Sequence, residues 1–393
     1  MFLPVVQKGP EPRVMLMQAL GADGRRAAES VLSAIPGYGA TPLVSLPGLA
    51  NATGVAAIHL KDEGKRFGLG SFKALGGAYA ILTLVLAQAS QQLGRPVTAG
   101  ELDRPEVRAI ASGMTFCCAT DGNHGRSVAW GAQLAGAGCE IFIHAGVSPG
   151  REQAMAAFGA RMNRIAGNYD DSVALAAQRA GENGWTVVSD TAWPGYETIP
   201  LTVMQGYTTM IGEALDALGQ PPTHIFLQAG VGGMAAAVAS YASQRLGDAA
   251  PKIIVVEPAR AACLFETAKA GRMVTLPHGE PTVMAMLECA TPSPLGWEVL
   301  QNLADGYVTL EEDESPRAMR LLANPLSGDP AVVSGESGCT GLAGLLACMA
   351  NDEAKAALSL GPDSRILVFN SEGATDPAIY RQIVGKAPNE VAP

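Results

Sequence analysis

Short apolar runs alternate with longer, alanine-rich amphipathic segments along most of the chain. The apolar runs predict strands at 115–120 (TFCCAT), 139–145 (CEIFIHA), 185–190 (WTVVSD), 224–230, 252–258 and 365–370. Helical spacing predicts helices at 126–138, 149–160, 168–184 and 236–247. Such alternation is typical of βαβ units. We therefore expect an α/β fold with parallel-rich sheets flanked by helices.

The same alternation predicts two domains. The run 106–194 has its own succession of strands and helices, whereas 1–105 and 195–393 supply the two halves of a larger sheet. We expect a small α/β domain inserted into a large one, with a ligand in the interdomain cleft at the carboxyl ends of the strands. The first dozen residues and the tail 385–393 are expected to be loose.

Composition narrows the class of protein. With 393 residues, 48% of them hydrophobic, the chain can bury a large core. A net charge of −10 argues against nucleic acid or anionic membrane as a partner. The longest apolar candidate, 80–90, falls short of the roughly 20 residues that span a bilayer, and the N-terminus lacks a signal pattern. We expect a cytoplasmic protein with no membrane contact.

The seven cysteines and five histidines show no metal-type spacing. An odd number of cysteines in a cytosolic chain indicates buried free thiols, and we expect no metal site.

One lysine stands in an unusual setting. In RFGLGSFKALGGAYA (66–80), Lys73 follows Phe72 in a glycine-rich turn at the entrance to an alanine-rich helix. The ordinary interpretation of a single lysine is a solvated surface charge. Apolar flanks would instead bury the amine and lower its pKa, because burial disfavours the ammonium form. A neutral amine attacks carbonyl carbons, so this setting indicates Schiff-base chemistry.

Two loops that follow strands are candidate binding elements. In QAGVGGMAA (228–236), glycines let backbone N–H groups approach an anion at a helix N-terminus, although a tight turn without a ligand explains the same loop. The spacing does not complete GxGxxG, which disfavours a dinucleotide. In TDGNHG (120–125), Asp121, Asn123 and His124 would face the cleft, or serve only as turn residues.

Taken together, these segments resemble a known family. SFKALGGAYA, TDGNHGRSVAWGAQ and GVGGM occur in this order in the fold-type II pyridoxal-phosphate enzymes. SDTAWPGYETIPLTVMQGY, TPSPLGWEVL, SGESG and NSEGATDP resemble the diaminopropionate ammonia-lyase subfamily, with matches between residues 40 and 385. The resemblance implies pyridoxal 5'-phosphate in the interdomain cleft, a small amino-acid substrate and a homodimer.

The resemblance also implies which residues bind the cofactor. Lys73 would hold it covalently, Asn123 would bond its phenolic oxygen, and residues 230–234 would surround its phosphate. Ser371 would contact the pyridine nitrogen, with Asn370 as the alternative. A hydroxyl there leaves the cofactor a weaker electron sink than a carboxylate would, which suits elimination. The implied set is Lys73, Phe72, Asn123, Gly230, Val231, Gly232, Gly233, Met234 and Ser371.

Two aspartates are implied to act with Lys73 in catalysis. Asp121 and Asp190 match positions that serve α-proton abstraction and recognition of the substrate amine, and a carboxylate would pair with a β-ammonium group. Asp121 as a turn residue and Asp190 as a helix cap are the structural alternatives. Glu336 and Ser337 in SGESG complete the implied substrate-binding set, although the glycines alone would explain that loop.

Cys263 and Cys289 match positions that can pair as a disulfide near the substrate entrance in the resembled lyases. In a cytosolic protein we expect free thiols instead.

The implied activity is α,β-elimination of 2,3-diaminopropionate, as the D and/or L enantiomer, to pyruvate and ammonia. One alternative is another pyridoxal-phosphate-dependent lyase or dehydratase of the same fold, acting on serine, threonine or an amino-sugar acid. A nicotinamide-dependent enzyme and a non-catalytic phosphate-binding homologue are the other two alternatives.

Overall fold

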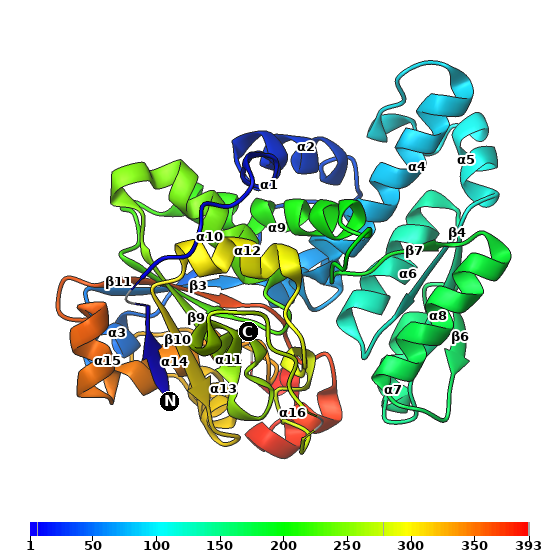
Figure 1. Cartoon of the computed structure of the whole chain (residues 1–393). Helices are drawn as coiled ribbons and strands as arrows, with labels where there is room; N and C mark the ends of the chain where they lie inside the picture. The colour runs from blue at the N-terminus through cyan, green and yellow to red at the C-terminus, as the bar shows by residue number, and fades with distance from the viewer. Residues whose placement is uncertain (6, 278, 392–393) are drawn as a thin grey trace. The chain divides into compact units, whose positions relative to one another are not determined.

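The computed structural model describes residues 1–5, 7–277 and 279–391, and the chain divides into two compact units (Figure 1). The first unit comprises 1–22, 40–72 and 210–393, and the second comprises 23–39 and 73–209. The predicted inserted range 106–194 lies inside the second unit, which also contains 73–105.

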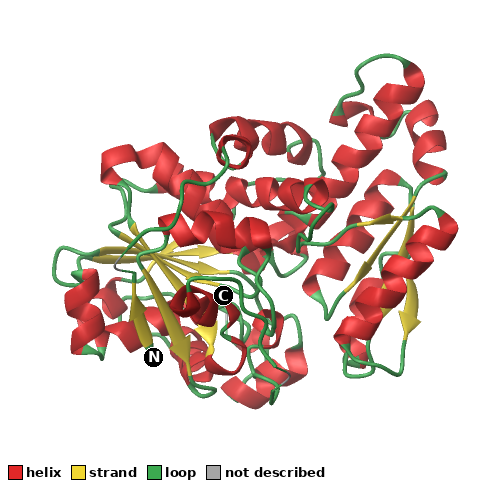
Figure 2. Ribbon diagram, viewed as in Figure 1, coloured by secondary structure: helices red, strands yellow, loops and turns green. Residues whose placement is uncertain are grey.

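The first unit is built on a seven-stranded sheet in the order β1-β10-β9-β8-β11-β3-β2 (Figure 2). Its five central strands pair in parallel, and the two edge strands, β1 and β2, pair antiparallel to their neighbours. The strands are β1 (Phe2–Pro4), β2 (Leu43–Ser45), β3 (Ala57–Asp62), β8 (His224–Gln228), β9 (Lys252–Pro258), β10 (Gly306–Leu310) and β11 (Arg365–Asn370).

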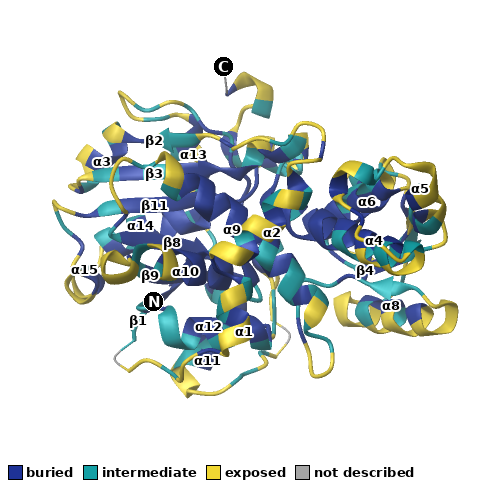
Figure 3. Cartoon of the chain, turned by 90° about the horizontal axis from the view of Figure 1, so that it is seen from above, coloured by how far each residue is buried: buried dark blue, intermediate teal, exposed yellow. Residues whose placement is uncertain are grey.

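The helices of this unit are α1 (Val14–Ala19), α3 (Pro47–Thr53), α10 (Gly233–Leu246), α11 (Cys263–Ala270), α12 (Pro294–Leu303), α13 (Glu314–Ala323), α14 (Thr340–Met349), α15 (Asp352–Leu358) and α16 (Pro377–Val384). β8 and β10 are buried at every residue, and Figure 3 shows the labelled strand β8 in the dark blue of buried residues. Such continuous apolar runs are what a sheet covered on both faces requires.

The second unit contains a four-stranded parallel sheet in the order β6-β5-β4-β7. Its strands are β4 (Thr115–Ala119), β5 (Gly138–Ile143), β6 (Arg161–Arg164) and β7 (Thr186–Val187). Its helices are α4 (Gly77–Leu93), α5 (Pro105–Ser112), α6 (Asn123–Ala135), α7 (Pro149–Ala156) and α8 (Tyr169–Asn183). α2 (Ala22–Leu32) and α9 (Thr198–Ala217) each have residues in both units.

The α/β class with parallel-rich sheets is confirmed, and the differences lie at element ends. β9 and β11 have the predicted limits, whereas the run 185–190 forms a strand only at Thr186–Val187. α6 begins at Asn123 rather than 126, so half of the predicted turn 120–125 is helical. The first dozen residues are not all loose, because β1 pairs with β10 from Phe2 to Pro4. Of the predicted loose tail, 392–393 lie outside the described residues.

One helical stretch, Phe72–Leu93, is long and apolar enough to cross a membrane by length and composition, which the sequence analysis did not expect. Within the protein, 72% of its apolar window is buried. A core helix of a folded domain meets the same test, and this stretch has that burial.

A cluster of charged side chains is buried in the first unit. Arg66, 1% exposed, pairs with Glu63 at 2.8 Å and with Glu213 at 2.7 Å. Glu213 also accepts a bond from Lys61 Nζ at 2.6 Å. Burial alone would raise the pKa of the Glu63 carboxyl, but the adjacent Arg66 guanidinium and Lys61 hold it below its usual value. Glu63 therefore stays ionised beside Arg66, and the cluster anchors the chain that leads to Lys73.

Glu213→Ala should destabilise the protein by about 3–5 kcal/mol, because it leaves Arg66 and Lys61 as buried charges with one partner fewer. The measurement is the shift of the urea unfolding transition. Glu298→Ala is the matched control: Glu298 pairs with the exposed Arg13, and its loss should cost less than about 1 kcal/mol. Similar shifts for the two variants would contradict the importance of the buried cluster.

Candidate active site

Lys73 lies in the short 3-10 helix η2 (Phe72–Leu75), just before α4. Its Nζ is 2.5 Å from Asp190 Oδ2, and each of the two side chains is 20% exposed. The apolar flanks predicted a dry, uncharged amine, and the structure instead pairs a half-buried amine with a carboxylate. Asp190 is 117 residues away in the sequence, so the residues around Lys73 could not reveal this partner.

The glycines around Lys73 allow close packing of its backbone. Ser127 Oγ donates a 2.7 Å hydrogen bond to the Lys73 carbonyl. A Cβ on Gly77 would lie 2.6 Å from that Ser127 hydroxyl. A Cβ on Gly206 in α9 would lie 1.7 Å from the Leu75 carbonyl oxygen, which is impossible for any other residue. Glycine is therefore required where α6 and α9 approach the segment that carries Lys73.

Asp190 and His124 form the electrostatic surroundings of this amine. Burial acts to raise the pKa of the Asp190 carboxyl, but the charge of Lys73 and its hydrogen bond outweigh burial and hold that pKa well below its usual range. Burial lowers the pKa of His124, whose Nε2 lies 2.8 Å from the Val188 carbonyl. The ring is thus neutral, and its Nδ1 is 3.9 Å from Asp190 Oδ2.

Asp121 has the opposite setting. Burial raises the pKa of its carboxyl, and His144, whose Nε2 lies 2.7 Å from Asp121 Oδ1, opposes the rise without cancelling it. Asp121, His144 and Asp190 follow β4, β5 and β7 respectively. These strands are parallel neighbours, so the second unit brings the three side chains to one edge of its sheet.

The glycine loop of the first unit joins β8 to α10. None of the backbone N–H groups of residues 230–234 donates a hydrogen bond to another described residue, and no side chain caps α10. Gly232 adopts a φ of +92°, which favours glycine. A run of N–H groups without acceptors at the start of a 14-residue helix is suited to an anion such as a phosphate.

Ser371 and Asn370 at the end of β11 are bonded differently. The Asn370 side-chain amide donates to Asp62 Oδ1 at 2.7 Å and to the Val333 carbonyl at 3.0 Å, which uses both of its protons. Ser371 Oγ accepts a 2.8 Å bond from Gln228 Nε2. No acceptor among residues 1–5, 7–277 and 279–391 takes its own hydroxyl proton, so Ser371 is the better donor of the two.

The remaining predicted residues of the first unit lie near these loops. The Phe72 N–H donates to the Ser371 carbonyl at 3.0 Å. Glu336 and Ser337 are buried, and Ser337 Oγ accepts from the Met286 N–H at 3.1 Å. The structure therefore assembles the predicted residues as two groups, one in each unit.

Both candidate cysteines lie against the glycine loop, and neither is in a disulfide. Cys263 Sγ is 3.6 Å from the Gly230 carbonyl, and a Cβ on Gly230 would lie 2.9 Å from Cys289 Sγ. Among the described residues, no three His, Cys, Asp or Glu side chains gather as a metal-type group.

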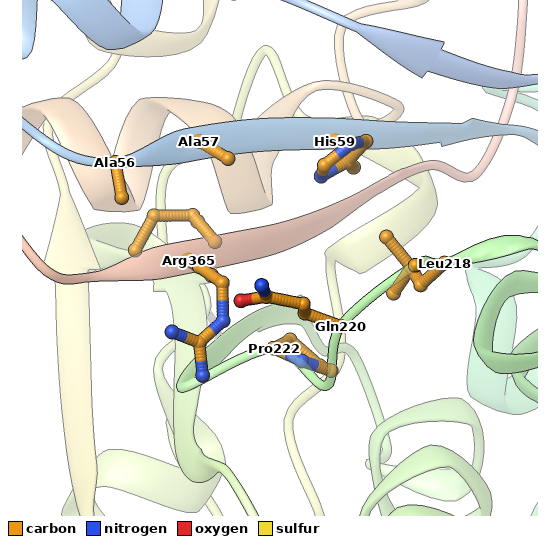
Figure 4. Close-up of a pocket in the computed structure, with 9 residues that line it drawn as sticks. Ala56, Ala57, His59, Leu218, Gln220, Pro222 and Arg365 are labelled. Atoms are coloured by element: carbon orange, nitrogen blue, oxygen red, sulfur yellow. The ribbon is translucent and has the colours of Figure 1, made fainter.

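A hollow of ≈ 520 Å³ lies elsewhere in the first unit (Figure 4). Its lining includes Ala57, His59 and Arg365, which lie at the amino-terminal halves of β3 and β11. Ser371 follows the opposite end of β11, so this hollow is separate from the predicted phosphate and ring-nitrogen contacts.

The sequence analysis missed three polar side chains next to the predicted residues. His144 and Gln228 interrupt apolar runs at the ends of β5 and β8, and such a polar residue at a strand's carboxyl end is the signal that could have indicated them. Tyr207 in α9 lies beside Lys73, whose charge opposes the effect of burial in raising the pKa of the Tyr207 hydroxyl. No local pattern marks Tyr207.

These groups fit pyridoxal phosphate. Lys73 offers an amine for its aldehyde, the N–H groups of 230–234 suit its phosphate, and Ser371 offers a hydroxyl donor for its ring nitrogen. The fit rests on donors that have no acceptor among the described residues and on an amine held beside a carboxylate.

Comparisons with known proteins agree with this fit. Residues 34–372 match the family described as "Pyridoxal-phosphate dependent enzyme". The chain is 41% identical over 365 residues to the diaminopropionate ammonia-lyase of Escherichia coli K12. The aligned region covers 91% of this chain and 90% of that relative.

Solved structures of the E. coli diaminopropionate ammonia-lyase have the same fold. The holo form superposes with a TM-score of 0.89 at 38% identity, covering 100% of this chain and 98% of that one. The complex with an aminoacrylate–PLP azomethine reaction intermediate has a TM-score of 0.87 at 37% identity, covering 98% and 96%. The chain therefore belongs to the pyridoxal-phosphate dependent enzymes, in the family of the diaminopropionate ammonia-lyases.

Proposed function

We propose that the protein removes ammonia from 2,3-diaminopropionate by α,β-elimination. The net reaction consumes one water and gives pyruvate and two molecules of ammonia. One observation carries the proposal beyond family membership: the second unit holds two carboxylates, Asp121 and Asp190, whose pKa values are shifted in opposite directions. Carboxylates that differ in this way can divide charge recognition and proton transfer between them.

Pyridoxal phosphate, when bound, supplies an aldehyde for the substrate amine and an electron sink for the pair of electrons left at Cα. Lys73 would hold it covalently, and the N–H groups of residues 230–234 would hold its phosphate. Ser371 would donate to the ring nitrogen, and Asn123, buried at the start of α6, would bond the phenolic oxygen. Phe72 would pack beside the cofactor.

Asp190 is suited to binding a cation. Its lowered pKa keeps it ionised, so it is a poor proton acceptor but a strong partner for an ammonium group. The β-ammonium of diaminopropionate carries the positive charge that serine lacks. Asp190 would therefore select the diamine, and the buried Glu336 and Ser337 would contribute to the substrate-binding set.

Asp121 is suited to proton transfer. Its raised pKa makes it a better proton acceptor than an ordinary aspartate. Lys73 and Asp121 would remove the α-proton from opposite faces, which would permit both enantiomers. Because the β-ammonium already carries its proton, it would leave as neutral ammonia, and the base would afterwards release the α-proton to solvent.

The alternative within the same chemistry is elimination from serine, threonine or an amino-sugar acid. Release of ammonia and keto acid from a panel of these substrates separates it from the diaminopropionate reaction. Following the family resemblance, we also propose that the protein works in the cytoplasm as a homodimer.

Lys73→Ala should abolish covalent attachment of the cofactor and lower turnover by at least about 10³-fold, since the amine serves as both attachment point and base. Borohydride reduction of the holoenzyme followed by peptide mapping should label the peptide that contains Lys73. The Lys73→Ala protein should carry no label. A label on another lysine, such as the buried Lys61, would contradict the assignment.

Asp190→Asn should lower kcat/KM for diaminopropionate relative to serine by roughly ten- to hundredfold, the effect of losing a charged hydrogen-bond partner. The ratio of the kcat/KM values for the two substrates cancels any change that affects both, including the loss of the ion pair between Lys73 and Asp190. Asp171→Asn, at the exposed start of α8, is the control and should leave the ratio unchanged. An unchanged ratio in Asp190→Asn would remove the recognition role.

Asp121→Asn should lower turnover of one enantiomer by about 10²–10⁴-fold and spare the other. In the unchanged enzyme, kcat/KM for the sensitive enantiomer should fall as pH drops through the raised Asp121 pKa, because a protonated carboxyl cannot accept the α-proton. Kinetics with D- and L-2,3-diaminopropionate across pH measure both effects. Equal losses of turnover for the two enantiomers in Asp121→Asn would contradict the two-base mechanism.

A further inference from the structure

The contact between Asp121 and His144 follows from the register of two strands. β4 and β5 pair in parallel, with Ala119 opposite Phe142. Asp121 and His144 each come two residues after this pair, past the strand ends, and therefore lie opposite each other. His144 Nε2 lies 2.7 Å from Asp121 Oδ1. The pair thus lies just past the ends of two paired strands.

Backbone bonding assigns the proton on the His144 ring. The Gly146 N–H donates to His144 Nδ1 at 3.1 Å, so Nδ1 carries a lone pair. In the neutral ring the proton then lies on Nε2, which donates to the Asp121 carboxylate. A proton on Nδ1 would set two N–H groups against each other.

The turn that holds this ring is fixed from a third strand. Arg164 of β6 donates to the carbonyls of Ala145 at 3.1 Å and Val147 at 3.0 Å, and pairs with Glu152 of α7 at 2.6 Å. A Cβ on Gly146 would lie 2.8 Å from His144 Cε1. The ring position therefore depends on Arg164 and on the absence of a side chain at Gly146.

Only one oxygen of Asp121 is bonded within the described residues. Oδ1 accepts from His144, and no hydrogen bond to Oδ2 is formed there. The charged groups that act on Asp121 besides His144 are Arg151, which favours the ionised carboxylate, and Asp190, which disfavours it. His144 is the only one of these that bonds the carboxylate directly and can fix its orientation.

We propose that His144 is the positioning residue of Asp121: its ring donates from Nε2 to Oδ1, orients the carboxylate and leaves Oδ2 to accept the α-proton of one substrate enantiomer. This inference rests on the proposed function, in which Asp121 is the base. It adds to that function a residue that controls which enantiomer is turned over and at what pH.

The test measures kcat and KM with D- and L-2,3-diaminopropionate across pH for His144→Ala and His144→Gln. His144→Ala should lower kcat for the Asp121-dependent enantiomer at least tenfold, with little change for the other enantiomer. For this enantiomer, the acidic limb of the pH profile of the His144→Ala enzyme should move to higher pH. Asp121 loses the hydrogen-bond donor that favours its ionised form. His144→Gln keeps an N–H donor of similar reach and should recover most of the loss. Equal, pH-independent losses for both enantiomers would overturn the proposal.

A glycine pair provides a milder test if His144→Ala folds poorly. Gly146→Ala should displace the ring and reproduce the enantiomer-selective loss in part. Gly150→Ala, four residues on, is the matched control, because a Cβ there has nothing within 4 Å. A loss that is the same for both glycine variants would count against the proposal.

The double variant Asp121→Asn/His144→Ala separates this inference from the proposed function. If His144 acts through Asp121, its loss should add little once Asp121 is replaced. Should Asp121→Asn affect both enantiomers equally, the assignment of the base fails. Should Asp121→Asn be selective while His144→Ala is not, only the role of His144 fails.

Nitrogen-15 NMR of the histidine rings in the holoenzyme gives a readout apart from activity. The chain has five histidines, and His144→Gln identifies the resonances of His144. We expect the neutral ring of His144 to carry its proton on Nε2. A neutral ring with its proton on Nδ1 would refute the assigned tautomer.

Discussion

Parallel strand pairing is the constraint on which the candidate site depends. In both sheets it places the residues that follow neighbouring strands at one edge. Asp121, His144 and Asp190 meet in this way in the second unit, and Gln228 and Ser371 do so in the first. Polar groups gathered at such an edge can bond one another while the apolar strand bodies remain in the core. The candidate catalytic and binding residues are thus concentrated where the paired strands end.

The two aspartates show how neighbours set different roles for the same residue type. Both are removed from bulk water, which alone favours a protonated carboxyl. Asp190 lies beside the amine of Lys73 and remains ionised, whereas Asp121 is bonded to His144 and keeps a raised pKa. At Asp190 the effect of Lys73 outweighs desolvation, and at Asp121 desolvation outweighs the opposing effect of His144. The identity of each partner therefore distinguishes a charge-binding carboxylate from a proton-accepting one.

The surroundings of Lys73 depend on tight packing as well as charge. Gly77 and Gly206 let α6 and α9 approach the turn that carries the lysine, and Ser127 bonds its carbonyl. Before this turn, the chain is anchored by Arg66 and its two glutamates. If the loop were loosely held, its backbone would lose conformational freedom each time the lysine bonded a ligand. Packing of this kind fixes the backbone of Lys73 in advance.

The sequence by itself determined the α/β class, the strands from 252 to 258 and from 365 to 370, and the residues that the family motifs mark. Apolar periodicity and glycine-rich turns are local signals, so they are visible in the sequence without knowledge of the fold. The tertiary structure alone decided the partners: Asp190 for Lys73, His144 for Asp121 and Gln228 for Ser371. These pairs join residues 23 to 143 positions apart. Strand order and register create such contacts, and no local pattern encodes either of them.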